Sequence, residues 1–185
     1  FLFLNLSATD NLHRVVHTND RGEVQQSYLP SEMSLDMIYN EISFVRDKNG
    51  EVYIFPPFSN AIYRWTSEGP KPVFRTDFGK NAAEEDVKSS YDITESGKAF
   101  NTGFFIVDNH LVNRFFHSEK NYYSLYDMEK GTQHIITPDT TEVIPFAPQW
   151  QSAKGLIGYI LTTDYDKWKP RKDSCDAALF VFHLK

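Results

Sequence analysis

Six histidines are the first residues to consider for metal chemistry, because neutral imidazole is a common zinc ligand. His13 and His17 are four residues apart. In a strand this spacing puts both side chains on one face but about 13 Å apart, too far for two ligands of one Zn²⁺. His110 and His117 are expected on different faces or at different ends of a strand. The sequence therefore predicts no metal site, and we expect no cofactor.

Acidic side chains gather in two polar stretches, residues 84–86 and the pair Asp164 and Asp166. Two carboxylates about 5–10 Å apart could cleave a glycosidic bond, but linear spacing does not bring such a pair together. A solvated acidic loop is the simpler interpretation. The chain also has no G-x-S-x-G elbow, no readable Ser-His-Asp arrangement and no EF-hand spacing. The sequence therefore predicts no catalytic residue.

Aromatic side chains offer a different chemistry, which is stacking on a ligand. Trp65 lies in a β-like run and is expected to pack inside the fold, whereas Trp150 ends such a run. Trp168 lies in a polar loop beside Tyr165. An exposed ring there could stack on a sugar or a peptide aromatic, or it could fold back over an open sheet edge. Tyr165, Trp168 and Trp150 are therefore the candidate ligand-binding residues.

Composition limits the partners of this chain. Of its 185 residues, 41% are hydrophobic and 15% aromatic, enough for a sizeable core in one domain. A net charge of -6 with scattered basic residues argues against nucleic acid, and the basic run 167–172 is interpreted as a solvated loop. One cysteine, Cys175, excludes an internal disulfide without fixing the compartment. No apolar run is long enough to span a membrane. Because the chain opens inside a strand-like FLFLNL without a signal peptide, we expect a piece of a longer chain.

The elements that must position these residues are short strands. Residues 41–79 contain four β-like runs separated by turn-forming sequences such as DKNG and SEGPK. Four such strands in up-and-down order are what one blade of a β-propeller needs. The pattern repeats imperfectly, giving approximate blades at 1–30, 41–79, 99–138 and 143–185 with three, four, four and three strands.

This strand count predicts an all-β fold, a single partial propeller domain over residues 1–185. The first blade lacks its inner strand and the last lacks its outer one, so the two gaps do not complete each other. We therefore expect roughly half of a larger ring, whose open blade edges pair with another copy or with a missing N-terminal portion. In this fold Trp65 would pack between blades, and Trp150 would lie near the central channel or a blade interface.

The connecting loops divide between the two faces of such a propeller. Loops joining strands one to two and three to four are short, whereas the other face holds the long segments 31–40, 80–98 and 164–176. Residues 82–90 could form one or two helical turns. Long loops on a rigid scaffold are where binding usually occurs, so we expect a site on the long-loop face.

Two stretches carry a family resemblance. The run AIYRWTSEGPKPVFRTDFGK at 61–80 and the terminal DAALFVFHLK at 176–185 resemble the six-bladed β-propeller proteins of unknown function common among Bacteroidetes, many of them predicted lipoproteins. The resemblance implies that this chain corresponds to about three and a half blades in the C-terminal half of a six-bladed parent. It also implies a periplasmic or surface location in the cell envelope, with a lipid anchor on the full-length protein. The family offers no catalytic residues to transfer.

Three functions are consistent with these patterns. The first is a non-enzymatic module of the cell envelope that binds a carbohydrate or protein ligand. The second is a glycan-directed hydrolase or lyase with its site at the channel mouth, and the third is a scaffold that pairs through its exposed blades. An enzyme should cluster groups with perturbed pKa values at the channel mouth. A binding module should show an aromatic platform without them. All three rest partly on fold analogy.

Overall fold

The computed structural model of this chain describes residues 1–4, 13–31, 43–56, 58–82, 90–137, 146–152, 155–161 and 177–184. Within these ranges it contains fourteen strands, one 3-10 helix, η1 (Gly79–Asn81), and one α-helix, α1 (Ser90–Glu95). The strands are β1 (Leu2–Leu4), β2 (His13–Thr18), β3 (Val24–Pro30), β4 (Phe44–Arg46), β5 (Val52–Ile54), β6 (Ala61–Thr66), β7 (Gly69–Arg75), β8 (Phe100–Val107), β9 (His110–His117), β10 (Lys120–Asp127), β11 (Thr132–Ile136), β12 (Trp150–Ser152), β13 (Gly155–Leu161) and β14 (Ala177–Phe182). No helix among the described residues is long and apolar enough to cross a membrane.

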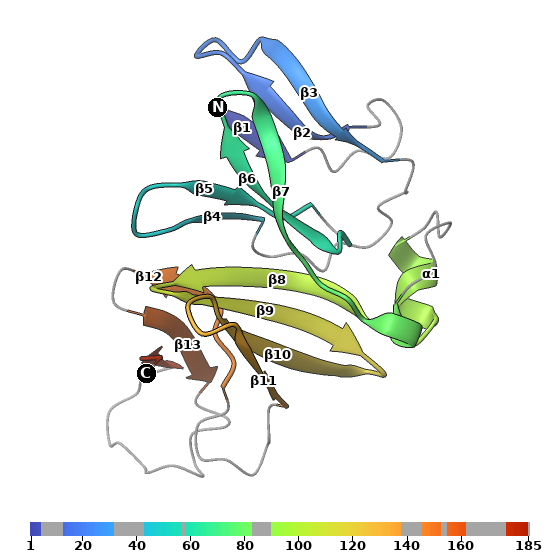
Figure 1. The fold of residues 1–185 in the computed structure, drawn as a ribbon, viewed down its shortest axis with the longest axis vertical. Coiled ribbons are helices and arrows are strands. Elements are labelled where there is room, and N and C mark those ends of the chain that lie inside the picture. The colour runs from blue at the N-terminus through green and yellow to red at the C-terminus, as the bar shows by residue number, and fades with distance from the viewer. Residues whose placement is uncertain are drawn as a thin grey trace.

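The strands form four antiparallel sheets in which neighbours in space are neighbours in sequence. The sheets contain β1–β3, β4–β7, β8–β11 and β12–β14, which gives three, four, four and three strands among the described residues. Figure 1 shows the sheets following one another from the N-terminus to the C-terminus. The predicted all-β fold is therefore confirmed, and the grouping of strands agrees with the sequence pattern.

The core lies between the sheets and is centred on β8, which is buried along its whole length. Alternate residues of a strand point to opposite faces. Accordingly, Phe104 and Ile106 join a cluster with residues of the β4–β7 sheet, such as Phe55. Phe105 and Val107 join a second cluster that reaches Leu156 on β13. The continuous apolar run FFIV thus serves two sheet interfaces, because neighbours cover both faces of its strand.

The first two sheets meet through aromatic rings. Trp65 on β6 makes edge contacts with His17 and Tyr28, at centroid distances of 5.5 and 5.3 Å. The expectation that Trp65 packs between blades is therefore confirmed. β3 contacts β7, the last strand of the second sheet. Strands β1 to β3 therefore correspond to the second to fourth strands of the next sheet. Among the described residues the first sheet has no inner strand, in agreement with the sequence-based expectation.

Two strand boundaries differ from the sequence-based expectation. SEGPK was expected to be a turn, but β7 already begins at Gly69, and the turn contains only Ser67 and Glu68. Gly69 has a φ of +104°, and a Cβ there would lie within 2.5 Å of the Tyr28 ring. The close approach of β3 therefore permits only glycine at this position. The predicted helical turns at 82–90 fall mostly outside the described residues, and α1 follows them.

The DFG stretch has a structural role at the end of β7. Asp77 Oδ1 accepts a hydrogen bond of 2.7 Å from the Gly79 backbone N–H, which fixes the turn into η1. The Phe78 ring packs on Phe115 of β9 with centroids 5.3 Å apart. These contacts tie the second sheet to the third.

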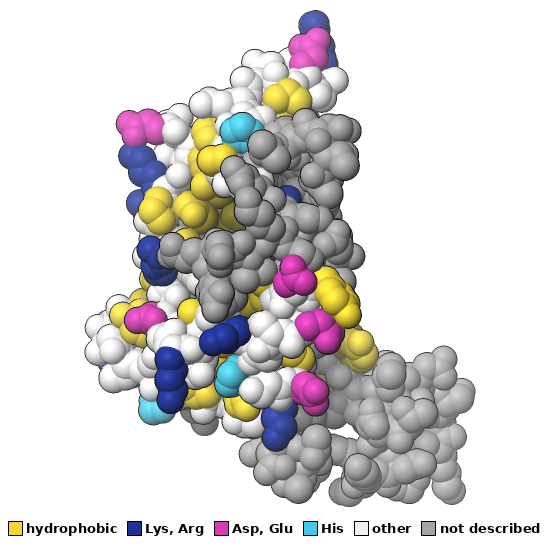
Figure 2. All heavy atoms as spheres, turned by 90° about the vertical axis from the view of Figure 1, so that its right-hand side faces the viewer, with side chains coloured by type: hydrophobic (Ala, Val, Ile, Leu, Met, Phe, Trp, Pro, Cys, Tyr) yellow, Lys and Arg dark blue, Asp and Glu magenta, His cyan; other side chains and the backbone are white. Residues whose placement is uncertain are grey.

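Figure 2 shows that Lys and Arg side chains share one face of the molecule with Asp and Glu side chains. The described part of that face is therefore not the unbroken basic surface that nucleic acid requires.

Candidate functional site

A hollow of about 870 Å³ opens where the first strands of three sheets converge. Its lining comes from residues 43–48 around β4, 105–108 at the end of β8, and 150–152 of β12. β8 contacts both β4 and β12 (Figure 1). In a propeller the first strand of each blade borders the central channel, so this hollow occupies the channel position. It is referred to below as the channel hollow.

Gln151 joins the three strands that border the channel hollow. Its Oε1 accepts a hydrogen bond of 2.9 Å from the Ile106 backbone N–H, and its Nε2 donates one of 2.8 Å to the Arg46 carbonyl oxygen. Inner strands are sheet edges, so they present backbone N–H and C=O groups without a strand partner. The Gln151 amide on β12 thus provides a hydrogen-bond partner both for the backbone N–H of Ile106 at the edge of β8 and for the carbonyl of Arg46 at the edge of β4.

Replacing Gln151 with leucine is expected to lower the free energy of unfolding by about 1–3 kcal/mol, because the Ile106 N–H loses its partner in a partly buried position. Urea denaturation followed by circular dichroism measures the change. Gln149→Leu is the matched control, since the Gln149 side-chain amide donates to the nearby Ala147 carbonyl at 3.4 Å, a contact within one segment of the chain. Equal losses in both variants would contradict the bridging role of Gln151.

Trp150 stands beside the channel hollow as part of an aromatic pair. It stacks on Tyr159 with centroids 5.8 Å apart and an angle of 29° between the rings. The two residues are 51% and 43% exposed. Residues directly opposite each other on neighbouring strands lie on the same face of a sheet. Tyr159 on β13 is opposite Leu179 on β14, and Ile157 is opposite Val181, so these side chains share the face of the Trp150–Tyr159 pair. This brings further apolar surface next to the rings.

Leu179 is 72% and Val181 50% exposed. Their neighbours in sequence point the other way, and Phe182 packs with Leu156 against the third sheet. Trp150, Tyr159, Leu179 and Val181 therefore share the side of the last sheet that faces away from the third sheet. These four residues are called the open face. A sheet side with this exposure is typical of a surface that receives another element.

Charged residues reach the channel hollow from two turns. Asp47 Oδ1 accepts hydrogen bonds of 2.9 Å from the backbone N–H groups of Asn49 and Glu51, so this oxygen organises the β4–β5 turn. Lys48 Nζ donates to Asn109 Oδ1 at 3.4 Å, which links that turn to the β8–β9 turn. Asp108, which also lines the hollow, has a left-handed φ of 52°. The polar rim of the hollow is thus largely built by turn chemistry.

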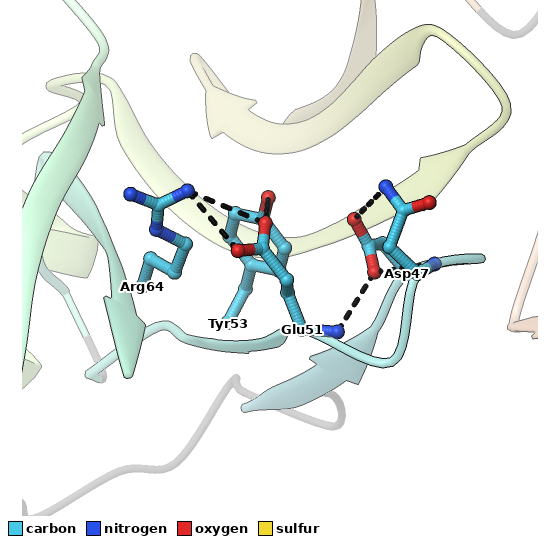
Figure 3. Close-up of polar contacts among 5 residues, drawn as sticks. Asp47, Glu51, Tyr53 and Arg64 are labelled. Carbon is cyan, nitrogen blue, oxygen red and sulfur yellow. Dashed lines mark hydrogen bonds and ion pairs between the residues drawn. The ribbon is translucent and has the colours of Figure 1, made fainter. Parts of the chain in front are cut away.

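A polar cluster follows the same turn (Figure 3). The Glu51 carboxylate pairs with Arg64 Nη1 at 3.2 Å and accepts a hydrogen bond from the Tyr53 hydroxyl at 3.2 Å. Burial, together with the nearby carboxylates of Glu51 and Asp47, raises the pKa of Tyr53 to about 12. The Tyr53 hydroxyl therefore remains a donor to Glu51 over the physiological pH range.

The raised pKa of Tyr53 predicts a loss of stability in alkali. The unfolded tyrosine ionises near pH 10 and the folded one near pH 12, so unfolding releases a proton between these values. The stabilisation is complete below about pH 10 and declines as the pH rises toward 12. Urea midpoints measured across this range should fall more steeply for the wild type than for Tyr53→Phe. Identical slopes would contradict the assignment.

A second displaced pKa lies on another turn. The pKa of Asp127 falls to about 2, because its carboxylate accepts hydrogen bonds from the Lys130 backbone N–H and ammonium and from the Glu129 backbone N–H. Burial also lowers the pKa of Arg14. Neither residue, nor Tyr53, lines the channel hollow. Among the described residues, no group of three or more His, Cys, Asp or Glu side chains could hold a metal ion.

The predicted ligand-binding residues have different outcomes. Trp150 lines the channel hollow, although it begins β12 instead of ending a longer strand. Pro148 has no backbone N–H and so cannot donate a hydrogen bond to β13. The hydrogen bonds to β13 start with the Gln149 N–H, which donates to the Ile157 carbonyl. Tyr165 and Trp168 lie outside the described residues, as does part of the 80–98 loop. The expected site on the long-loop face therefore stays a prediction.

The channel hollow itself borders the β4–β5 and β8–β9 turns, which belong to the short-loop face. Sequence reasoning missed Gln151 and Tyr159. Period-two alternation in GLIGYIL could have assigned Tyr159 to one strand face with Ile157. No sequence signal identifies Gln151, because its two partners are backbone groups on distant strands.

Comparison with known proteins agrees with the fold described above. No curated protein matches the chain in sequence. A crystal structure from Bacteroides fragilis, described as that of a "putative exported protein", aligns with a TM-score of 0.72 at 12% identity and covers 90% of this chain. The chain spans 52% of the length of that structure. The family model DUF5128, described as 6-bladed beta-propeller, matches residues 2–143. The chain therefore belongs to this family of six-bladed β-propellers.

Proposed function

We propose that this chain is a non-enzymatic binding module of the bacterial cell envelope, and that its partner is a protein that packs on the open face. The observation that carries this proposal is the continuous exposure of Trp150, Tyr159, Leu179 and Val181 on three adjacent strands. Apolar surface of this kind on a soluble domain marks a protein interaction site. Aromatic rings flanked by aliphatic side chains are also the composition of interface centres.

The chemistry of the partner follows from the sheets themselves. Inside the chain, the second and third sheets and the third and fourth sheets bury alternate apolar side chains between them, as Phe104 and Phe55 do. The open face offers the same kind of surface without a covering sheet among the described residues. The partner that fits it is another antiparallel sheet with an apolar face, and a second copy of this chain is the form of partner that can be tested directly.

The test is the solution mass of the chain by light scattering over a range of concentrations. The wild type is expected to self-associate, whereas the double variant Leu179→Lys, Val181→Lys should remain monomeric. Ile135→Lys is the matched control, because Ile135 is 55% exposed on a different sheet. A wild type that stays monomeric throughout would contradict the proposal, as would dissociation caused equally by Ile135→Lys.

A carbohydrate ligand would give a different result. A planar pair such as Trp150 and Tyr159 can stack on the apolar face of a sugar. If a glycan array detects binding that Trp150→Ala abolishes, while the solution mass is unchanged by the double variant, the open face serves a sugar and not a protein.

We also propose an extracytoplasmic location. It is supported by the Bacteroides fragilis structure, which is described as that of an exported protein, and by the family resemblance of the sequence. Lipid anchoring of the full-length protein stays a prediction from that resemblance. Fractionation of cells that express the full-length protein, with labelling of surface-exposed lysines, tests both points. Recovery in the cytoplasmic fraction would contradict them.

Glycan hydrolysis is the second candidate, favoured by one observation. Asp47 and Asp108 come from different turns and both line the channel hollow. Asp47 Oδ1 already serves the turn, so Asp108 is the residue to test as the acid or base. Incubation with a panel of polysaccharides should release reducing ends, and Asp108→Asn should abolish the release. Absence of release from every polysaccharide would leave the binding module as the function.

A further inference from the structure

The channel hollow presents charged groups that the fold itself does not use. Four charged side chains line it, those of Arg46, Asp47, Lys48 and Asp108. The Asp47 carboxylate is occupied by its own turn, since Oδ1 accepts two backbone N–H groups and Oδ2 accepts from Asn49 Nδ2 at 3.4 Å. Within the described part of the chain, no hydrogen bond or ion pair engages the Arg46 guanidinium or the Asp108 carboxylate. Arg46, Lys48 and Asp108 therefore remain for a ligand.

The two cations reach the hollow with donors to spare. Arg46 and Phe44 are two residues apart on β4, so their side chains share one face of the strand, whereas Val45 between them is buried in the core. Lys48 Nζ donates to Asn109 Oδ1 at 3.4 Å, and an ammonium group has three N–H donors. A guanidinium and an ammonium can therefore both approach an anion in the hollow.

These groups select a class of ligand. A guanidinium suits a carboxylate, to which it can donate two parallel hydrogen bonds. Asp108 would repel a ligand that has anionic groups alone, but its oxygens can accept from hydroxyl groups. The hollow also contains Trp150 and Phe44, which are 51% and 36% exposed and suit the apolar face of a sugar ring. A sugar acid offers the carboxylate, the hydroxyl donors and the apolar ring face together.

We propose that the channel hollow binds a short chain of uronic acid residues, with a carboxylate on Arg46 and Lys48 and hydroxyl groups on Asp108. The volume of about 870 Å³ is large for a ligand pocket and has room for more than one sugar residue. The chain has a net charge of -6, so the attraction comes from these local cations and is weakened by salt. The inference goes beyond the open-face proposal and does not depend on it, because Arg46 is not part of the open face.

The binding test uses tri-D-galacturonate and tri-D-mannuronate, each beside its methyl ester as the uncharged match. Isothermal titration calorimetry at low ionic strength should detect at least one of the acids, bind its ester more weakly, and lose the signal as sodium chloride is added. Absence of binding for both acids would overturn the proposal, as would equal affinities for acid and ester. The zwitterionic dipeptide glycylphenylalanine is titrated in parallel, and tighter binding of this dipeptide would overturn the proposal and assign the hollow to peptide ends.

Two variants and a matched control locate the site. Arg46→Gln removes the charge and should weaken binding about tenfold. The variant should fold, because the Arg46 side chain is exposed and its link to Gln151 runs through the backbone carbonyl. Lys48→Gln should also weaken binding, whereas Arg21→Gln, on the exposed β2–β3 turn outside the hollow, should leave the affinity unchanged.

The same variants separate this site from the open face. Trp150 borders both surfaces, so Arg46 is the residue that distinguishes them. Loss of uronate binding in Arg46→Gln with an unchanged solution mass would support the hollow as an independent site. Binding that survives both Arg46→Gln and Lys48→Gln, or that Arg21→Gln reduces equally, would overturn the proposal.

Discussion

Replacing Phe104 with alanine is expected to lower the free energy of unfolding by about 3–5 kcal/mol, the usual cost of deleting a buried phenylalanine ring. Phe104 is fully buried and meets Phe55 edge to face at a centroid distance of 5.9 Å. The two rings join the second and third sheets, so the substitution opens a cavity at the interface between them. Equilibrium urea denaturation measures the change in unfolding free energy. Because folded domains are only marginally stable, the variant is also expected to be partly unfolded at room temperature.

Phe3→Ala is the control for this experiment. Phe3 is 52% exposed at the edge of the first sheet, so its removal should change the unfolding free energy by less than about 1 kcal/mol. Similar losses for Phe3→Ala and Phe104→Ala would show that the sheets do not share the core described here.

Gly155→Ala is expected to destabilise the last sheet by about 3 kcal/mol or more. Gly155 has a φ of +138°, a conformation that is essentially restricted to glycine. A Cβ at this position would also lie 2.5 Å from the carbonyl oxygen of Phe182 on β14. A backbone atom in a strand cannot move aside as a flexible side chain can. The substitution should therefore separate β14 from β13. Because the freed strands become accessible to protease, cleavage in the segment C-terminal to residue 155 should be faster than in the wild type.

The chain offers its own control in Gly103→Ala. A Cβ at Gly103 would meet Arg114 Nε at 3.8 Å, an ordinary van der Waals distance, and its φ lies outside the left-handed range. The unfolding free energy should change by less than about 1 kcal/mol. If Gly103→Ala were as damaging as Gly155→Ala, the loss would reflect the removal of any strand glycine and not the approach of β14.

Local chemistry allowed most of the fold to be predicted from the sequence. DKNG forms the β4–β5 turn because Asp47 accepts two backbone N–H groups and Gly50 takes a φ of +82°. Runs such as HLVNRFFHS between two turn sequences had a single interpretation as strands. The strand grouping followed from these repeats. The start of β7 was misjudged because GPK resembles a turn, whereas Gly69 is required by the tertiary contact with Tyr28.

The candidate site was much less predictable. Trp150 was recognised as an aromatic near the channel, but its stacking on Tyr159 depends on how β12 pairs with β13. The register between β12 and β13 is set by backbone hydrogen bonds, and these cannot be predicted from the residue types in the two strands. The charged groups of the channel hollow are equally hidden, because Arg46 and Asp108 line one hollow only when β4 and β8 lie side by side.

The strand order has a kinetic consequence. Each of the four described sheets is built from consecutive strands, so every strand pairing joins segments that are adjacent in the chain. Loop closure between such segments is fast, and hairpins form in microseconds. A sheet can therefore assemble as soon as its own segment is available, and only the packing of one sheet on the next requires distant parts of the chain to meet. During synthesis the N-terminal sheets would form while later ones are still being made, and each new sheet would complete the burial of the one before it.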